Sequence, residues 1–173
     1  MSTYIALFRG INVGGRNRLA MKDLVAFMQT AGASDVRTYI QSGNVVYRGD
    51  AGNAISTTAL IEEQHGFRPD VIVLGVEAFN HAVKNNPFKE AEGKACHFYF
   101  CSQVPESVDE NRLVQLCKGS EAYELKGNVF YLHAPEGIGR SKLAAQVERC
   151  LGVAGTGRNL NTINQLVALA EQV

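Results

Sequence analysis

The residues best suited to chemistry in this chain lie in the stretch LFRGINVGGRNRL, residues 7–19. It holds three arginines and three glycines but no acidic residue: Arg9, Gly10, Gly14, Gly15, Arg16 and Arg18. Glycines let backbone amides approach a ligand, and guanidinium groups offer planar forks of donors to phosphate or carboxylate oxygens. The pattern predicts an anion-binding loop. The alternative is that the glycines only form tight turns and the arginines are solvated.

This stretch does not fully match either of two known nucleotide-binding motifs. Gly10 and Gly15 have the spacing of a phosphate-binding P-loop, yet Arg16 and Asn17 stand where that motif needs Lys and Ser or Thr. The phosphate-reaching ammonium and the magnesium-binding hydroxyl are therefore missing, which argues against nucleotide hydrolysis. The dinucleotide fingerprint G-x-G-x-x-G is also absent. We expect no cofactor.

Two segments of the second half carry further candidates for anion binding. In PEGIGRSKL, residues 135–143, Arg140 and Lys142 lie at a predicted helix start that Ser141 would cap. In TGRNLNT, residues 156–162, helix capping explains the asparagines, and Asn161 is the expected N-terminal cap. Capping does not explain Arg158, which is the candidate for anion binding. Ordinary helix capping is the alternative explanation for both segments.

Charge and hydropathy narrow the classes of partner. The chain has 17 basic and 17 acidic residues, so no overall charge favours nonspecific binding to nucleic acid or membranes. Residues 1–48 carry six basic residues against two acidic ones, which places any anion preference in this part. No apolar stretch approaches the roughly 20 residues of a membrane span, and the N-terminus lacks the pattern of a secretory signal. We expect a cytoplasmic protein without a membrane partner.

Cysteines and histidines give no sign of a metal site or of histidine-based catalysis. The four cysteines show neither a CxxC motif nor zinc-ligand spacing, and we expect free thiols: Cys96, Cys101, Cys117 and Cys150. The four histidines are scattered without an i, i+4 pair. We expect no metal, and the sequence does not identify catalytic residues.

Hydrophobic periodicity predicts the elements that must position these residues. The first half reads as strand 4–8, helix 21–32, strands 36–40 and 45–47, helix 54–64 and strand 71–74. This is the βαββαβ order of a ferredoxin-like fold. In such a sheet the first two strands are parallel, so the end of strand 4–8 and the turn QSGN emerge at one edge. We therefore expect this turn to lie beside the arginines, where Gln41, Ser42 and Asn44 could add neutral hydrogen bonds. For Ser42 and Gly43 we favour the alternative, a plain hairpin turn that uses residues of high conformational tolerance.

The second half repeats this order after a connector helix. We expect strand 96–100, a helix with Leu113 and Leu116 on its apolar face, strands 122–125 and 129–133, and a helix through Leu143 and Leu151. The pairs SGNVVY and KGNVFY suggest an internal duplication. Where the first half has its fourth strand, we expect the second half to end in a helix instead. The expected domains are residues 1–75, a connector 76–93 and residues 94–173, giving an α+β protein of two ferredoxin-like halves.

Four segments in this order, RGINVGGRNRLAM, TYIQSGNVVY, PEGIGRSKL and TGRNLNT, resemble the domain-of-unknown-function family 1697. The similarity covers the chain from Tyr4 to the last helix. It implies a cytosolic, mostly bacterial α+β protein with two ferredoxin-like halves and no established activity. On this resemblance the motif positions are Arg9, Gly10, Asn12, Gly14, Gly15, Gln41, Ser42, Gly43, Asn44, Gly139, Arg140, Ser141, Arg158, Asn159, Asn161 and Thr162.

Three classes of function stay open. The motifs lack Asp, Glu, His and Cys except for Glu136, and an enzyme needs a general base or a nucleophile, so we favour a module that binds a phosphate-bearing molecule. An enzyme acting on such a ligand or on a nucleic-acid end is the first alternative. Recognition of RNA by the sheet is not favoured, because the third strand, NVVYRG, has only Tyr47 as an aromatic residue. A self-associating protein, with the loop in a homodimer interface, is the second alternative.

Overall fold

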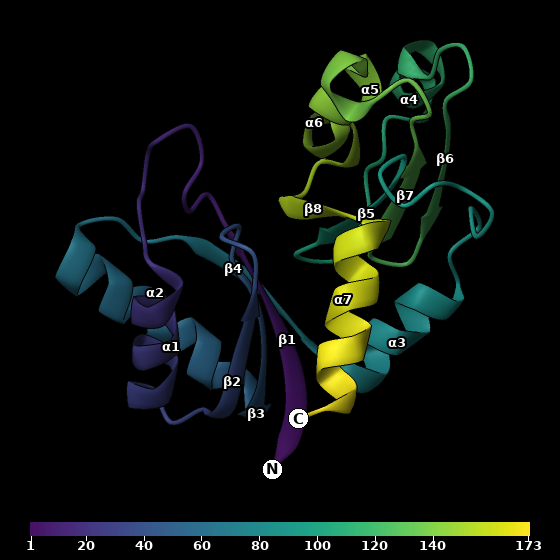
Figure 1. The fold of residues 1–173 in the computed structure, drawn as a ribbon. Coiled ribbons are helices and arrows are strands. Elements are labelled where there is room, and N and C mark those ends of the chain that lie inside the picture. Colours follow the sequence, from purple (N-terminus) through teal and green to yellow (C-terminus); the bar gives the residue numbers. More distant parts are fainter. The chain divides into compact units, whose positions relative to one another are not determined.

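The computed structural model describes residues 1–173 as a mixed α+β protein (Figure 1). By its contacts the chain divides into two compact units, Met1–Val83 with Asn164–Val173 and Lys84–Ile163. None of its helices combines the length and apolar character that crossing a membrane requires. The boundaries expected at residues 75 and 93 stay a prediction; the contact-based units differ by placing residues 76–83 and 164–173 with the first unit.

The first unit contains one antiparallel sheet with the strand order β2-β3-β1-β4. Its elements are β1 (Ser2–Arg9), α1 (Met21–Thr30), β2 (Ser34–Tyr39), β3 (Asn44–Gly49), α2 (Ala51–His65), β4 (Asp70–Gly75) and α3 (Val76–Lys84). Strands β1 and β2 both run antiparallel to β3, so they are parallel to each other. The end of β1 and the β2–β3 turn therefore lie at the same edge of the sheet.

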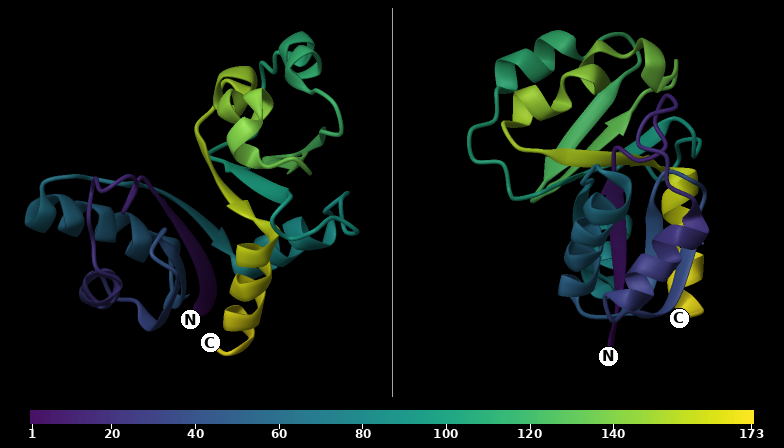
Figure 2. Two further views of the ribbon diagram at one scale, coloured as in Figure 1. Left: turned by 45° about the horizontal axis from the view of Figure 1, so that its top comes forward. Right: turned by 90° about the vertical axis from the view of Figure 1, so that its left-hand side faces the viewer.

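Helices α1 and α2 cover one face of this sheet (Figure 2). Leu24 and Met28, four residues apart on α1, pack with Ile61 of α2 against Phe8 of β1. Tyr47 of β3 lies in the same core, and its hydroxyl donates to the carbonyl of Asp50 at 2.9 Å. Apolar burial on this face holds β1, and with it the segment that follows β1, in a fixed place.

The second unit contains an antiparallel sheet with the order β6-β7-β5-β8. Its elements are β5 (Cys96–Cys101), α4 (Glu110–Leu116), β6 (Ala122–Lys126), β7 (Val129–His133), η1 (Ile138–Arg140), α5 (Lys142–Ala145), α6 (Val147–Leu151), β8 (Gly155–Asn159) and the start of α7 (Leu160–Glu171). Leu143, Val147 and Leu151 pack on Phe130 and Leu132 of β7. The single helix expected here is two short ones, α5 and α6, that meet at Gln146.

The prediction that the second half lacks a last strand is wrong. Residues Gly155–Asn159 form β8, which pairs antiparallel with β5. Two glycines lower the intrinsic strand preference of GTGRN, and this hides the strand from pattern reasoning. In the structure the glycines make room for a ring: a Cβ on Gly155 would lie 2.6 Å from Cε1 of Tyr99, and one on Gly157 would lie 3.1 Å from its Cδ2.

The N-terminal cap of the last helix also differs from the prediction. Helix α7 begins at Leu160, and Asn159 caps it by accepting a hydrogen bond from the Thr162 amide at 3.0 Å. Asn161, the expected cap, instead lies against Gly93, where its side chain would overlap any added Cβ. The helix starts earlier because β8 runs into it without a loop.

Candidate anion-binding site

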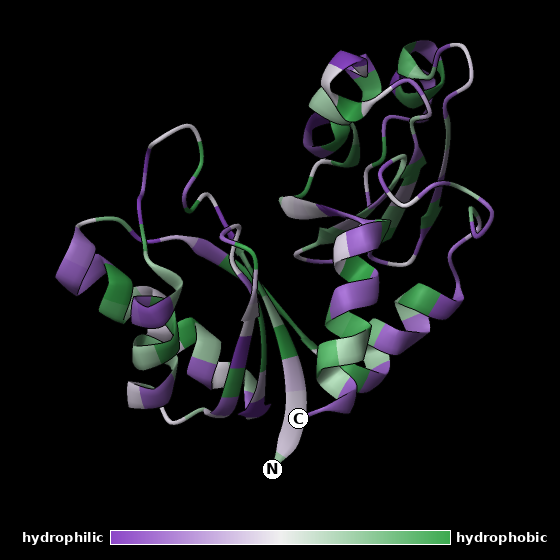
Figure 3. Ribbon diagram, viewed as in Figure 1, coloured by the Kyte–Doolittle hydropathy of each residue, from purple (hydrophilic) through white to green (hydrophobic).

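The segment after β1, residues 10–19, forms a small hairpin that we call the arginine loop. The Arg16 amide donates to the Val13 carbonyl at 2.9 Å, and the two glycines between them have positive φ, 56° for Gly14 and 75° for Gly15. Positive φ at both central residues is the geometry of a type I′ turn, which glycine adopts without strain. The hairpin gives the loop a defined shape. Figure 3 shows hydrophilic and neutral residues along most of this segment.

Two buried residues and two asparagines hold the loop in place on the first unit. Ile11 and Leu19 are only 1% and 2% exposed. The Asn12 side chain accepts from the Leu19 amide through Oδ1 at 2.8 Å and donates through Nδ2 to the Leu19 carbonyl at 2.8 Å. Asn17 donates through Nδ2 to the Gly10 carbonyl at 2.9 Å. These contacts fix both ends of the loop, so its exposed side chains are presented on a preorganised backbone.

The β2–β3 turn lies beside the arginine loop, as the topology predicts. Nδ2 of Asn12 also donates to the Gln41 carbonyl at 2.9 Å, and the Phe8 amide donates to the Gly43 carbonyl at 2.9 Å. A Cβ on Gly43 would lie 2.8 Å from Cβ of Phe8 and 2.9 Å from Cδ1 of Ile11. The turn therefore packs directly on the base of the loop, and the expected meeting of the two motifs is confirmed.

The polar residues of the turn have two different roles: one holds the turn together, and another has a side chain that is exposed to solvent. Asn44 is fully buried, and its Nδ2 donates to the Tyr39 carbonyl at 3.1 Å and to Oγ of Ser42 at 2.9 Å. These bonds close the turn. Gln41 is exposed, and its backbone carbonyl, not its side chain, accepts the hydrogen bond from Asn12. Gln41 is thus the turn residue whose side chain can extend toward a ligand on the loop.

Arg16 and Arg18 are the exposed charges of the loop. Neither guanidinium takes part in a salt bridge or a side-chain hydrogen bond within the chain. Nη2 of Arg18 lies 3.9 Å from the position that a Cβ would have on Gly15, so this guanidinium group sits next to the hairpin turn. Two cations on one preorganised hairpin form an electropositive surface that can bind an anion through charge-assisted hydrogen bonds.

The environment of Arg9 differs from the expectation of an acid-free segment. Arg9 is directly opposite Asp70 in the β1–β4 ladder, so the two side chains extend from the same face of the sheet. The sequence could not show this, because 61 positions separate the two residues. Arg16 and Arg18 therefore carry the argument for an anion site.

The remaining candidates belong to the second unit. Ser141 is buried and caps α5 by accepting from the Ala144 amide at 3.0 Å, which confirms the expected cap. Arg158 donates through Nη1 to Oγ1 of Thr156 at 2.6 Å and to the Gly157 carbonyl at 2.9 Å. Burial lowers the pKa of Arg158 to about 10, so the group stays charged at neutral pH. Asn159 is the cap of α7.

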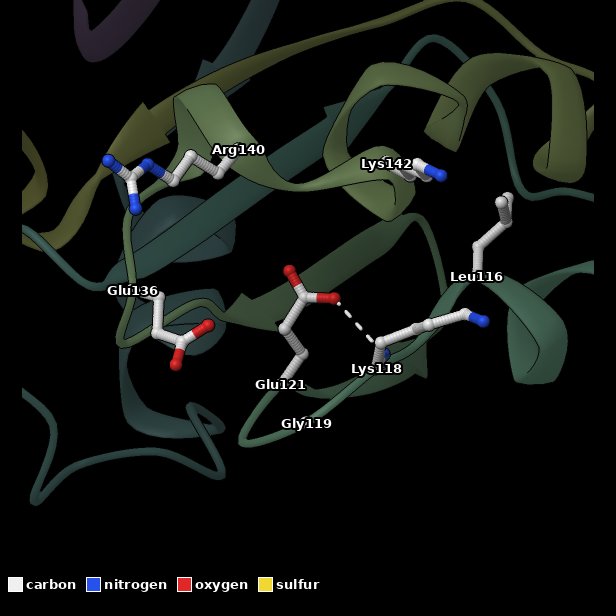
Figure 4. Close-up of a pocket in the computed structure, with 7 residues that line it drawn as sticks. All are labelled: Leu116, Lys118, Gly119, Glu121, Glu136, Arg140 and Lys142. Atoms are coloured by element: carbon white, nitrogen blue, oxygen red, sulfur yellow. Dashed lines mark hydrogen bonds between the residues drawn. The ribbon is translucent and has the colours of Figure 1, made fainter.

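Arg140 lines a cavity of about 310 Å³ in the second unit (Figure 4). The lining residues are Leu116, Lys118, Gly119, Glu121, Glu136, Arg140 and Lys142. Lys118 and Glu121, which lie in the connection between α4 and β6, are not predicted from the sequence. The only signal there was the charged run CKGSE, which is typical of an ordinary surface loop.

The four thiols are free, as expected. Burial, with a smaller contribution from Glu148, raises the pKa of Cys101 to about 11, and burial also raises the pKa values of Cys96, Cys117 and Cys150. Protonated thiols are poor nucleophiles. No cluster of three or more His, Cys, Asp or Glu side chains is placed to hold a metal ion.

Comparison with known proteins assigns the chain to a family without a known activity. It belongs to the family described as "Protein of unknown function (DUF1697)", whose model matches residues 1–131. Its fold is similar to that of the conserved bacterial protein SP0830 from Streptococcus pneumoniae, with a TM-score of 0.68, 21% identity and 99% of each chain covered. At this identity the likeness shows the fold alone. No curated protein matches the chain.

Proposed function

We propose that the arginine loop, together with the β2–β3 turn, binds a phosphate-bearing anion. The observation that carries this proposal is that Arg16 and Arg18 are exposed and have no partner within the protein. Both lie on a hairpin that is held in place by the side chain of Asn12 and by the buried residues Ile11 and Leu19. Phosphate oxygens accept paired hydrogen bonds from guanidinium groups. The ligand is a small phosphorylated metabolite or the phosphate of a nucleic-acid end, which share this chemistry.

Binding accounts for this surface better than catalysis. The loop and the turn contain no Asp, Glu, His or Cys, so they supply no general base. Ser42 offers a hydroxyl, and its oxygen accepts a hydrogen bond from Nδ2 of Asn44 at 2.9 Å, which is part of the closed turn. An enzyme acting on the same ligand would have to draw its base from elsewhere in the chain.

Self-association is the second candidate function, and one observation favours it. Val13 at the tip of the loop is 61% exposed and Ile40 in the turn is 52% exposed. Ile40 also has a φ of 49°, which a β-branched residue adopts only at a cost in free energy. A second copy covering Val13 and Ile40 would remove this apolar surface from water.

We also infer that the two sheets are duplicated ferredoxin-like units. Each has the order of elements strand, helix, strand, strand, helical segment, strand, and the orders β2-β3-β1-β4 and β6-β7-β5-β8 match position by position. Superposition of residues 2–75 on residues 96–159 tests this inference. Strands that fail to superpose in this order would contradict it.

A thermal-shift screen tests the anion proposal. Pyrophosphate, nucleoside monophosphates, sugar phosphates and short 5′-phosphorylated oligonucleotides are compared on the wild type and on the double variant Arg16→Gln/Arg18→Gln. We expect stabilisation of the wild type only, with affinity that falls steeply with salt for oligonucleotides and mildly for small ligands. The control Lys94→Gln/Arg149→Gln removes two exposed positive charges outside the loop and should behave as wild type. Equal stabilisation of the wild type and the loop variant would refute the proposal.

A further inference from the structure

The cavity of the second unit lies between two connections at one edge of its sheet. Lys118, Gly119 and Glu121 come from the connection between α4 and β6, and Glu136 and Arg140 from the connection between β7 and α5. Lys142 opens α5, and Leu116 at the end of α4 supplies an apolar wall. The volume of about 310 Å³ is at the lower end of the range for small-molecule sites.

The corresponding place in the first unit is filled. There the connections are α1–β2 and β3–α2, and the Asn53 side chain bridges them: Nδ2 donates to the Ala31 carbonyl at 2.8 Å, and Oδ1 accepts from the Asp50 amide at 2.8 Å. A Cβ on Gly32 would lie 3.1 Å from Nδ2 of Asn53. A sheet of this strand order can therefore close this edge with a polar side chain. The second unit instead leaves it open and lines it with charged residues.

The charges around the cavity do not neutralise one another within it. Three cations and two carboxylates line the wall, and no salt bridge joins any of them. Lys118 and Glu121 are joined by two hydrogen bonds: the Lys118 amide donates to Oε1 of Glu121 at 3.2 Å, and the Glu121 amide donates to the Lys118 carbonyl at 3.2 Å. The lining has a formal charge of +1, which a ligand of charge −1 would balance.

Figure 4 shows how the charged groups are distributed in the view drawn. The guanidinium group of Arg140 and the ammonium group of Lys118 extend to opposite sides, and the carboxylates of Glu121 and Glu136 lie between them. A complementary ligand has anionic groups toward its ends and a cationic group between the two carboxylates. A divalent metal ion is a poor fit, because two carboxylates compete with three cations.

We propose that this cavity binds a free acidic α-amino acid, a molecule with two carboxylates, one ammonium group and a net charge of −1. The ligand carboxylates pair with Arg140, Lys142 and Lys118, and its ammonium group donates to Glu121 and Glu136. Charge-assisted hydrogen bonds of both signs then orient one small, very polar molecule. The site shares no residue with the arginine loop, so it is a binding activity beyond the phosphate binding proposed for the first unit.

Isothermal titration of the full chain with L-glutamate tests this proposal. Glutarate, which lacks only the ammonium group, and 4-aminobutyrate, which lacks only the α-carboxylate, are the matched ligands. We expect L-glutamate to bind at least about tenfold more tightly than either, because each analogue loses one set of charge-assisted hydrogen bonds. Glutarate binding as tightly as L-glutamate, or no heat with any acidic amino acid, would overturn the proposal.

Variants separate this site from general charge effects. Glu121→Gln and Glu136→Gln should weaken L-glutamate binding by about tenfold or more while changing glutarate binding little, and Arg140→Gln should weaken both ligands. The control Lys94→Gln, at an exposed lysine outside the cavity, should leave both affinities unchanged. Selective binding of glucose 6-phosphate or orthophosphate over L-glutamate would show that the carboxylates do not select an ammonium group and would also overturn the proposal. Phosphate binding by the arginine loop, measured with pyrophosphate, should be unaffected by Glu121→Gln.

Discussion

The Asn12 side chain donates through Nδ2 to the Gln41 carbonyl at 2.9 Å and so ties the arginine loop to the β2–β3 turn. The same nitrogen donates to the Leu19 carbonyl, and Oδ1 accepts from the Leu19 amide. One side chain thus connects the two ends of the loop with the neighbouring turn. The shape of the proposed anion site depends on this asparagine rather than on the arginines themselves.

Replacing Asn12 should both destabilise the protein and weaken anion binding. Asn12→Ala removes three hydrogen bonds, and at about 0.5–1.5 kcal/mol each the expected loss of unfolding free energy is about 2 kcal/mol. The positive φ of 53° adds strain for alanine. Urea unfolding checks this value. The control Asn111→Ala, on the exposed face of α4, should change the unfolding free energy by less than about 0.5 kcal/mol. An equal effect of both substitutions would show that the Asn12 bonds contribute nothing.

Gly43 should tolerate substitution far less than a glycine of similar conformation elsewhere. In Gly43→Ala the new Cβ meets Phe8 and Ile11 at 2.8 and 2.9 Å on a backbone with φ of 91°. We expect a loss of about 1–3 kcal/mol from overpacking, in addition to the conformational strain. Gly119→Ala is the matched control, because its φ is 62° and no atom lies within 4 Å of the added Cβ. Equal losses for the two variants in chemical denaturation would mean that the turn does not pack tightly on the loop.

His97 should make the protein less stable in acid. It is 8% exposed, and its Nε2 has no hydrogen-bond partner. Burial lowers the pKa of His97 below its usual 6.5, although a backbone hydrogen bond at Lys94 acts in the opposite direction. Below pH 6.5 the unfolded chain therefore binds a proton that the folded chain does not, and the stability falls as the pH falls toward the folded pKa.

Unfolding free energies at pH 7.5 and 5.5 measure this effect. The difference between the two pH values should be smaller in His97→Phe than in the wild type, whereas His65→Gln, at an exposed histidine, should keep the wild-type difference. An unchanged pH dependence in His97→Phe would show that His97 does not titrate differently in the folded and unfolded states.

The thiols should react slowly in the folded protein. Burial is the main cause of the raised pKa in all four cysteines, and the pKa of Cys101 is about 11. Little thiolate is then present at neutral pH. Mass spectrometry after brief iodoacetamide treatment should find little modification in native protein and four modified cysteines in urea without a reductant. Fewer than four in urea would indicate a disulfide.

The meeting of the loop and the turn could be predicted because it follows from topology alone. Once residues 4–8 and 36–40 are assigned as parallel strands of one sheet, their ends must share an edge, and the Asn12 to Gln41 bond lies there. Strand β8 was missed because strand preference is judged from side chains, whereas its two glycines are needed to accommodate the ring of Tyr99. That requirement is a tertiary contact and leaves no local pattern.

Individual site residues were harder to predict than the location of the site. Asn12 and Asn44 read as polar ligand candidates, but their amide groups hold the backbone of the loop and the turn. Asp70 lies opposite Arg9 only after folding. Glu121 and Arg140 line the same cavity but come from two different connections, α4–β6 and β7–α5. No sequence motif with a fixed spacing contains both residues, so their proximity could not be predicted.

The most direct test of the anion site follows the arginine side chains themselves. Nε–Hε signals of ¹⁵N-labelled protein are recorded by NMR during a titration with pyrophosphate at low and at high salt. We expect saturable shifts at Arg16 and Arg18, weaker binding at high salt, and no saturable shift at the exposed Arg149. Shifts that do not saturate, or that are as large at Arg149 as at Arg16 and Arg18, would contradict a specific anion site on the loop.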